Sequence, residues 1–479
     1  FYCDLHLLRN TFDYFLPHWR PTQPWLFGEF CDADAFRDLV AIKEAHGGEL
    51  PWWAVEDTVR NPQGVRWDMH ILGQWANMEK YSLFSRREEL KEGQRRQTLL
   101  HRKHTVELVR SYRLMSGYVV TGLVDTPISI AGMFDDFGDI RYTPEEFSAF
   151  NADTVLFLGW HRRRNWVAGG DHPSYIDQHC HWAGDTVLPR LGISHYGAPA
   201  RIASAHLTLG TPNSPECYGT VPLTISPDIL EAGAVQQVGI GEITLPLVDK
   251  MTRLELRGTA CLESGEEIQN AWSLWVIPRP QWSLLPPLYA YDPDGKLVGL
   301  ERHNAEWTSL PTPNALTTSS HANRLLIATR WHEELTQLAQ EGERILLFVE
   351  RNSELPTTEC PFWREAMKLF EPHPLWDSFV HEGFTDLQFY GIATDAALLP
   401  EELAQKFPNA EIRSVLKRVD ARTFVATDYI SEVRFPSGGC LLISTLRPHG
   451  GIGDQPDGLL RSIGGLQLLF SALSTLVCS

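Results

Sequence analysis

The sequence has 479 residues, which as a prior corresponds to about three domains. Hydrophobic residues make up 43% and charged residues 21%, so a packed core can form without a disulfide framework. The 60 acidic residues outnumber the 42 lysines and arginines, and the net charge of −18 argues against nucleic acid or an anionic membrane as a partner, because both require a basic surface.

The first 165 residues alternate between strand-like and helix-like segments. The runs FYCDLHL (1–7) and PWLFGEF (24–30) are short and apolar, as expected of buried strands. A helix is predicted within 99–117, since Leu108, Tyr112 and Met115 follow helical spacing and Gly117 is a typical stop. The β-branched run YVVTGLVD (118–125) predicts a strand buried on both faces. The order strand, helix, strand indicates a parallel α/β unit.

A further helix is predicted near 143–158. Thr143 is a suitable cap, Pro144 suits the first helical position, and acidic residues fill the first turn. From 166 to 282, short alternating stretches separated by turns predict an antiparallel β-sandwich.

Two regions follow the predicted sandwich. Residues 283–320 are rich in proline, serine and threonine and indicate a linker with one hairpin. In residues 321–479, the runs 324–329 and 344–350 are predicted strands on either side of a helix at 331–342, and a strand, a glycine-rich loop and an apolar helix end the region. The overall prediction is a multidomain α/β plus β protein with a second α/β domain at 321–479.

Chemically active side chains close three consecutive strand-like runs. Asp4 and His6 end the first, Glu29 the second and Asp125 the third. In a parallel barrel, functional side chains lie at the carboxyl ends of strands. Trp25 and Trp53 lie near these ends in the sequence, and aromatic rings can stack on sugars. The pattern favours a sugar-cleaving pocket, although each acid taken singly fits a solvated loop better.

The segment RPTQPWLFGEF, residues 20–30, resembles the seventh barrel strand of glycoside hydrolase family 2, which is led by proline and ends in a glutamate nucleophile. The following segment, 102–147, is similar to the next part of that family. It contains an E-x-x-R pair, Glu107 and Arg110, and an acidic-aromatic turn at 135–138 before Arg141. The chain departs from the family where Gly28 replaces the usual serine and where LVDTPIS (123–129) replaces a tryptophan-rich strand end.

This resemblance implies a fold for each region. Residues 1–165 would be strands six to eight of a (β/α)8 TIM barrel, a partial barrel. Residues 166–282 would be an immunoglobulin-like sandwich, 283–320 a linker with a hairpin, and 321–479 a flavodoxin-like or amidotransferase-like α/β domain. A full barrel needs about 250 residues. The family's acid/base glutamate, which lies on the fourth strand, is therefore expected upstream of Phe1, and this chain alone is expected to be inactive.

The same resemblance implies a retaining hydrolase of terminal β-glycosides that needs no cofactor. Glu29 would be the nucleophile, and the residues expected to contact the sugar are Asp4, His6, Trp25, Trp53 and Asp125. A non-catalytic carbohydrate-binding or scaffold protein remains the alternative, and a homo-oligomer stays open.

Four other features bear on function and location. His179 and His181 flank Cys180 but have no further ligand in the sequence, so no metal site is predicted. An amidotransferase would need a cysteine–histidine contact in the last domain, and neither Cys360 nor Cys440 has a suitable setting. The eight cysteines form no C-x-x-C pair, which indicates reduced thiols and slightly favours the cytoplasm. No segment reaches the roughly 20 apolar residues of a membrane span.

Overall fold

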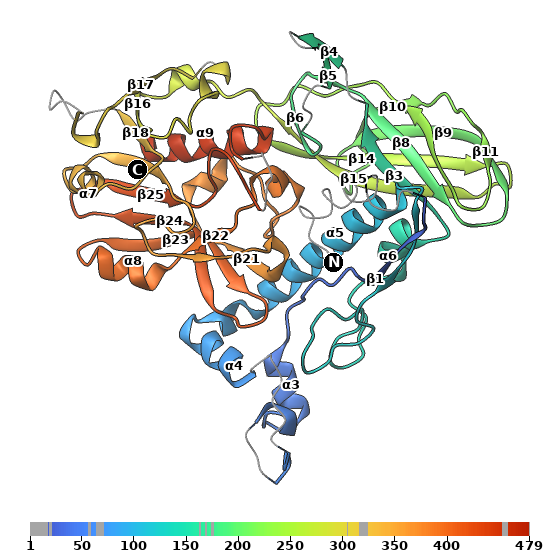
Figure 1. Ribbon diagram of the computed structural model, residues 1–479, viewed down its shortest axis with the longest axis horizontal. Helices are drawn as coiled ribbons and strands as arrows, with labels where there is room; N and C mark the ends of the chain where they lie inside the picture. Colours follow the sequence, from blue (N-terminus) through green and yellow to red (C-terminus); the bar gives the residue numbers. More distant parts are fainter. Residues whose placement is uncertain are drawn as a thin grey trace. The chain divides into compact units, whose positions relative to one another are not determined.

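The computed structural model describes residues 18, 22–55, 59–63, 71–161, 164–167, 170–173, 177–303, 305–315, 324–452 and 458–478. The protein is a multidomain mixed α/β protein with several β-sheets, as predicted (Figure 1). No barrel is formed by the strands of these residues. The chain divides into two compact units. The first contains the described parts of Phe1–Ala33, Thr98–Val124 and Ala131–Arg279, and the second those of Asp34–Gln97, Asp125–Ile130 and Pro280–Ser479.

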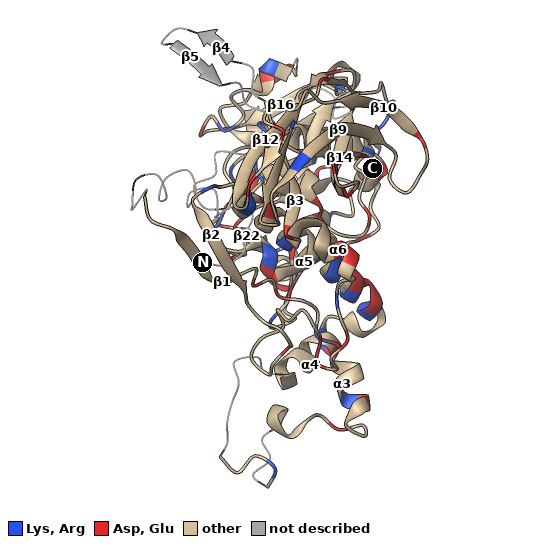
Figure 2. Ribbon diagram, turned by 90° about the vertical axis from the view of Figure 1, so that its right-hand side faces the viewer, with Lys and Arg blue, Asp and Glu red and all other residues tan. Residues whose placement is uncertain are grey.

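The first unit contains the predicted parallel pair. Strand β1 (Trp25–Phe30) pairs in parallel with β2 (Met115–Val120) (Figure 2). In this register, Leu26 lies opposite Gly117. Helix α5 (Arg87–Arg110) lies between the two strands in the sequence and leads into β2. Its residues up to Gln97 belong to the second unit, and those from Thr98 on belong to the first. The strand–helix–strand prediction is therefore confirmed.

Two predicted elements in this region have the wrong bounds. Helix α5 starts well before residue 99 and ends at Arg110, and Gly117 lies inside β2. The strand predicted at 118–125 begins at Met115 and ends at Val120, because the backbone turns at Gly122 with a φ of +82°, where side-chain-bearing residues are strained. The helix expected at 143–158 is α6 (Pro144–Asn151), followed by strand β3 (Thr154–Trp160).

The start of α6 confirms the predicted cap. The Thr143 hydroxyl accepts a hydrogen bond from the Glu146 backbone N–H at 3.2 Å, and the Glu146 carboxylate accepts one from the Thr143 N–H at 2.9 Å. This reciprocal capping box depends only on residues three apart in the sequence, which is why it was predictable.

The rest of the first unit is built mainly from antiparallel sheets, in which β6 pairs in parallel with β15. A three-stranded sheet has the order β12-β8-β3, and a six-stranded sheet has the order β10-β9-β14-β15-β6 with β11 on β9. Two small pairs, β4–β5 and β7–β13, complete the unit. The bounds are β4 (Arg164–Val167), β5 (Gly170–Pro173), β6 (Cys180–Trp182), β7 (Thr186–Val187), β8 (Pro189–His195), β9 (Ala200–Gly210), β10 (Cys217–Pro222), β11 (Ile229–Leu230), β12 (Ala234–Ile240), β13 (Ile243–Thr244), β14 (Thr252–Leu262) and β15 (Glu267–Ile277).

The two larger sheets share one core. Leu156 and Ile193 of the three-stranded sheet lie in the same buried cluster as Leu207, Leu254 and Leu274 of the six-stranded sheet. Alternate residues of β9 point into this cluster, from Ala205 to Leu207 and Leu209, as expected when one face of an antiparallel strand is buried. These two sheets are called the sandwich below.

The second unit is built on a ten-stranded sheet. Its main order is β17-β16-β18-β19-β25-β24-β22-β20, and β23 joins β24 to β21. The first five strands of this order are parallel neighbours and the others antiparallel. The bounds are β16 (Leu288–Tyr291), β17 (Trp307–Ser309), β18 (Leu325–Ala328), β19 (Arg344–Phe348), β20 (Thr357–Glu359), β21 (Ala366–Phe370), β22 (Ala396–Leu398), β23 (Glu411–Asp420), β24 (Ala426–Arg434) and β25 (Cys440–Ser444).

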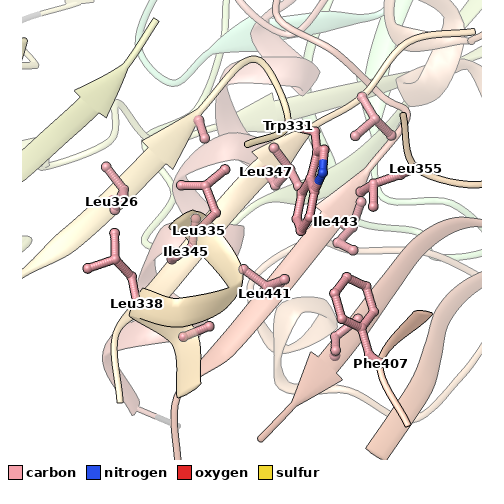
Figure 3. Packing of buried hydrophobic residues seen from close by; sticks show 14 of the residues in the cluster. Leu326, Trp331, Leu335, Leu338, Ile345, Leu347, Leu355, Phe407, Leu441 and Ile443 are labelled. Carbon is pink, nitrogen blue, oxygen red and sulfur yellow. The ribbon is translucent and has the colours of Figure 1, made fainter. Parts of the chain in front are cut away.

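The α-helices among the described residues of this unit are α3 (Leu39–Ala45), α4 (Ile71–Lys80), the first part of α5, α7 (Glu333–Gln340), α8 (Pro400–Lys406) and α9 (Ile463–Cys478). Helix α7 buries Leu335 and Leu338 against Ile345 and Leu347 of β19 and Ile443 of β25 (Figure 3). The predicted strand–helix–strand at 324–350 and the final strand and helix are thus confirmed. Strands β16 and β17, in the region expected to be a linker with a hairpin, pair in parallel in the large sheet. In the described part of the chain, every helix is too short or too polar to cross a membrane.

Candidate active site

The pair β1–β2 has one face packed on helices. Phe27 and Phe30 of β1 are buried with Val106 and Val109 of α5 and Phe150 of α6. The two phenylalanine rings stack with their centroids 5.2 Å apart. These contacts cover one face of the pair and fix which way its remaining side chains point.

Several apolar side chains of the pair are nevertheless exposed, although Met115 of β2 is buried. Leu26 is 65% and Val119 53% exposed, and Leu123, just after β2, is 70% exposed. Parallel sheets normally have both faces covered, and their strands are therefore apolar throughout. An apolar exposed face on a two-stranded parallel sheet is the pattern expected of strands that belong to a larger parallel sheet.

Glu29 lies at the carboxyl end of β1 and is exposed. Just after it, Phe30 is held by the end of β2, because its N–H donates to the Thr121 hydroxyl at 3.1 Å and its carbonyl accepts from the Thr121 N–H at 2.8 Å. The Glu29 carboxylate has no hydrogen bond or ion pair with any of the described residues. At Gly28 an added Cβ would meet no atom within 4 Å, so space does not dictate the departure from the serine of the resembled family.

Trp25 lies at the opposite end of the same strand. It is half-buried and packs against the phenylalanine cluster of β1 and α5, and its backbone N–H donates to the Leu114 carbonyl at 3.2 Å. Glu29 is four residue steps further along the strand, or about 13 Å away. The structure therefore does not bring Trp25 and Glu29 together at one end of β1.

The remaining predicted site residues are distributed over the chain. Asp4 and His6 lie outside the described residues. Trp53 belongs to the second unit, where it is half-buried against a hydrophobic cluster and lies 5.9 Å from the Arg37 guanidinium. Asp125 is also assigned to the second unit and is buried, five residues after the end of β2. Their roles in binding sugar stay predictions.

The E-x-x-R pair makes structural contacts. Glu107 accepts hydrogen bonds from Asn270 and Trp272 of the sandwich, and Arg110 donates to Ser194. The turn at 135–138 closes on itself, because the Asp135 carboxylate accepts the backbone N–H groups of 137 and 139 at 2.9 and 3.0 Å. The sequence pattern did not indicate Asn270 or Trp272, and no local signal marks them, since both lie more than 160 residues from Glu107.

The weaker candidates have structural explanations. Burial lowers the pKa of His181 to about 4, so this ring is neutral, and it packs 4.8 Å from the Trp160 ring. No cluster of three or more potential metal ligands exists among the described residues. Burial raises the pKa of the Cys360 thiol and raises that of Cys440 to about 12, so neither is a ready nucleophile.

No model of a known protein family matches the sequence, and no curated protein matches it. Among solved structures, the chain has a slight likeness to the sporulation control protein of Bacillus subtilis, with a TM-score of 0.20 and 12% identity over 32% of this chain and 56% of the other. A DNA-bound alkylpurine DNA glycosylase of Pseudomonas fluorescens has a TM-score of 0.17 and 11% identity, over 26% of this chain and 31% of the glycosylase. A family 123 glycoside hydrolase from Clostridium perfringens has a TM-score of 0.16 and 13% identity, over 32% of this chain and 34% of the hydrolase. Likenesses at these scores support neither a fold nor a function for the chain.

Proposed function

We propose that the chain is part of a retaining glycoside hydrolase related to glycoside hydrolase family 2, with Glu29 as its nucleophile. The observation that carries the proposal is the parallel pair β1–β2, which is backed by α5, exposes its other face and presents Glu29 at its carboxyl end. In (β/α)8 enzymes the chemistry occurs at this end of the strands. The exposed apolar side chains Leu26 and Val119 support the view that the pair belongs to a larger parallel barrel.

The proposed chemistry needs two carboxyl groups. In a retaining enzyme, one carboxylate attacks the anomeric carbon, expels the leaving-group oxygen and forms a glycosyl-enzyme. A carboxylic acid about 5–5.5 Å away protonates that oxygen and afterwards takes a proton from the water that releases the sugar. Glu29 fits the first role, because an exposed carboxylate at a strand end is accessible to a sugar. The second carboxyl group is unassigned among the described residues.

A sugar carrying a strongly activated leaving group tests the nucleophile by itself. A 2-deoxy-2-fluoro glycosyl fluoride needs little help from an acid, and the fluorine at C2 slows release, so the glycosyl-enzyme accumulates. The chain is incubated with the gluco, galacto, manno and glucurono forms, digested and mapped by mass spectrometry. A sugar ester on the peptide containing Glu29, absent in the Glu29→Gln variant, is the expected result. An ester on a different carboxylate, or none with all four sugars, overturns the assignment.

A non-catalytic carbohydrate-binding protein is the second candidate. The specific observation in its favour is that Glu29 is exposed and has no hydrogen bond or ion pair with the described residues, so nothing among them orients its carboxylate for attack. Titration calorimetry with the four parent methyl glycosides separates the two candidates. Binding that survives Glu29→Gln, together with absent labelling, supports the binding protein; labelling at Glu29 excludes it.

A further inference from the structure

Helix α5 carries a row of charged side chains that bond to the sandwich. Lys103, Glu107 and Arg110 are spaced by four and three residues, so they lie on one face of the helix. Glu107 is buried, with 9% exposure, although it is a carboxylate. A buried charge is tolerated only when its hydrogen-bonding capacity is satisfied, so the partners of Glu107 determine what it does.

Three donors surround the Glu107 carboxylate. Its Oε1 accepts from the Lys103 ammonium at 2.5 Å and from the Asn270 side-chain amide at 2.7 Å. Its Oε2 accepts from the Trp272 indole N–H at 2.8 Å. Asn270 is itself buried and fixed, because its amide also donates to the Leu156 carbonyl at 2.8 Å and its side-chain oxygen accepts from Lys103. Both oxygens of Glu107 therefore face donors from the sandwich or from α5.

Arg110 makes the second attachment, one turn further along the helix. Its guanidinium donates to the Ser194 hydroxyl at 3.0 Å and to the carbonyls of Ala152 and Asp153, each at 3.0 Å. It also lies 5.0 Å from the Tyr196 ring. Two attachments a turn apart fix the helix both along its axis and in rotation.

The neighbouring stripe of the same helix supports β1. Val106 and Val109 are fully buried against Phe27 and Phe30, the residues on either side of Gly28 and Glu29. Thr105 on the same part of α5 lies with its hydroxyl 3.6 Å from the Cys31 sulfur, just beyond the end of β1. A rotation of α5 would therefore move the strand that carries Glu29.

From these contacts we infer that Glu107 is a positioning residue for Glu29. The sandwich fixes α5 through Glu107, and α5 fixes the end of β1 through its valines. The sandwich then has a direct role in the site rather than being a separate appendage. This inference rests on the proposed function only for the chemical role of Glu29; the mechanical coupling from Glu107 to β1 stands apart from it.

Glutamine at position 107 distinguishes hydrogen bonding from packing. The side chain keeps its shape in Glu107→Gln, but one of its two acceptor oxygens becomes an NH₂ group that must face a donor. If Glu107 acts only by filling space, the substitution is silent. If Glu107 acts by accepting hydrogen bonds at both carboxylate oxygens, the helix must shift. Adding Trp272→Phe removes the indole N–H that would face the new NH₂ group of the glutamine. The remaining oxygen of that glutamine can then still accept hydrogen bonds from Lys103 and Asn270.

Hydrogen–deuterium exchange of the full chain, resolved by peptide, gives the readout. Glu107→Gln is expected to increase exchange in Trp25–Phe30 about tenfold, with little change in Thr252–Leu262 at the centre of the sandwich. The double variant with Trp272→Phe is expected to return exchange of β1 toward the wild-type rate. The matched control is Glu92→Gln, the same change on the same helix at an exposed carboxylate that pairs with Arg95, and it should leave β1 unchanged.

Two results would overturn the coupling. One is unchanged exchange of β1 in Glu107→Gln, and the other is an equal increase in β1 and in Thr252–Leu262, which means general destabilisation. If Glu107→Gln does not fold, Trp272→Phe alone removes one of the three donors and is expected to increase exchange of β1 more than in the Glu92→Gln control; no increase refutes the inference. Labelling of Glu29 by the fluoro sugar is scored separately, so a coupling without labelling rejects the proposed function and leaves the coupling standing.

Discussion

Asp428 on β24 is a buried carboxylate whose replacement by asparagine should stabilise the second unit at neutral pH. Its side chain is fully buried. The hydroxyls of Ser414 and Ser431 both donate to its Oδ2 at 2.8 Å, and Oδ1 has no hydrogen-bond partner among the described residues. Burial raises the pKa of Asp428 from 3.8 to about 7, against the opposing effect of the two serine donors. The folded protein therefore favours the neutral acid.

The direction and size of the effect follow from this raised pKa. Below pH 3.8 the group is neutral in the folded and unfolded protein, and its stabilising contribution is fully present. As the pH rises toward 7, the unfolded chain ionises first, and the contribution is progressively lost. Each pKa unit corresponds to about 1.36 kcal/mol, so the full difference is about 4 kcal/mol. The amide introduced by Asp428→Asn would stay neutral at every pH and avoid this loss.

Urea unfolding at pH 4.5 and pH 8 measures the difference. Asp428→Asn is expected to gain up to about 4 kcal/mol over the wild type at pH 8 and much less at pH 4.5. Asp377→Asn, at an exposed carboxylate of the same unit, is the control and should change stability little at either pH. An equal gain at both pH values, or none at pH 8, would refute the explanation by burial.

Three further predictions concern stability. Thr143→Ala removes the cap of α6 and should cost about 1 kcal/mol in chemical denaturation of the first unit, and no loss would contradict the capping box. Gly439→Ala should destabilise the second unit by about 2 kcal/mol or more, since an added Cβ would lie 2.8 Å from the Glu343 carbonyl oxygen; a neutral effect would mean that the turn relaxes. Arg324→Ala removes the guanidinium that pairs with the buried Glu343 carboxylate and should cost about 3–5 kcal/mol, whereas Arg351→Ala in an exposed pair should cost under about 1 kcal/mol, and similar losses would refute the role of burial.

The beginning of α5 shows why part of the fold was not predictable. Its first turns, REELKEGQRRQT, are polar and give no apolar stripe. Gln94 and Gln97 nevertheless are buried, because their side-chain amides donate to the backbone carbonyls of Asp34 and Ala366. Hydrophobic periodicity cannot detect a helix face that is buried through hydrogen bonds to distant backbone.

The candidate site was predictable to a similar degree. The apolar run before Glu29 indicated a strand, and the structure has β1 there with Glu29 at its end. The run did not indicate which side chains face the helices, and Trp25 packs at the other end of the strand. Asn270 and Trp272 were not identified, because their contacts with Glu107 join segments far apart in the sequence.

The sequence by itself determined the elements whose causes are local. The capping box of α6 lies within four residues, and the apolar runs of β18, β19 and β25 mark buried strands wherever they pack. Tertiary structure alone decided which strands are neighbours. Strand β25 lies between β19, which is about one hundred residues earlier in the sequence, and β24, which directly precedes it. It also decided that Glu107 is bonded to the sandwich rather than exposed, because a carboxylate is buried only where distant donors converge on it.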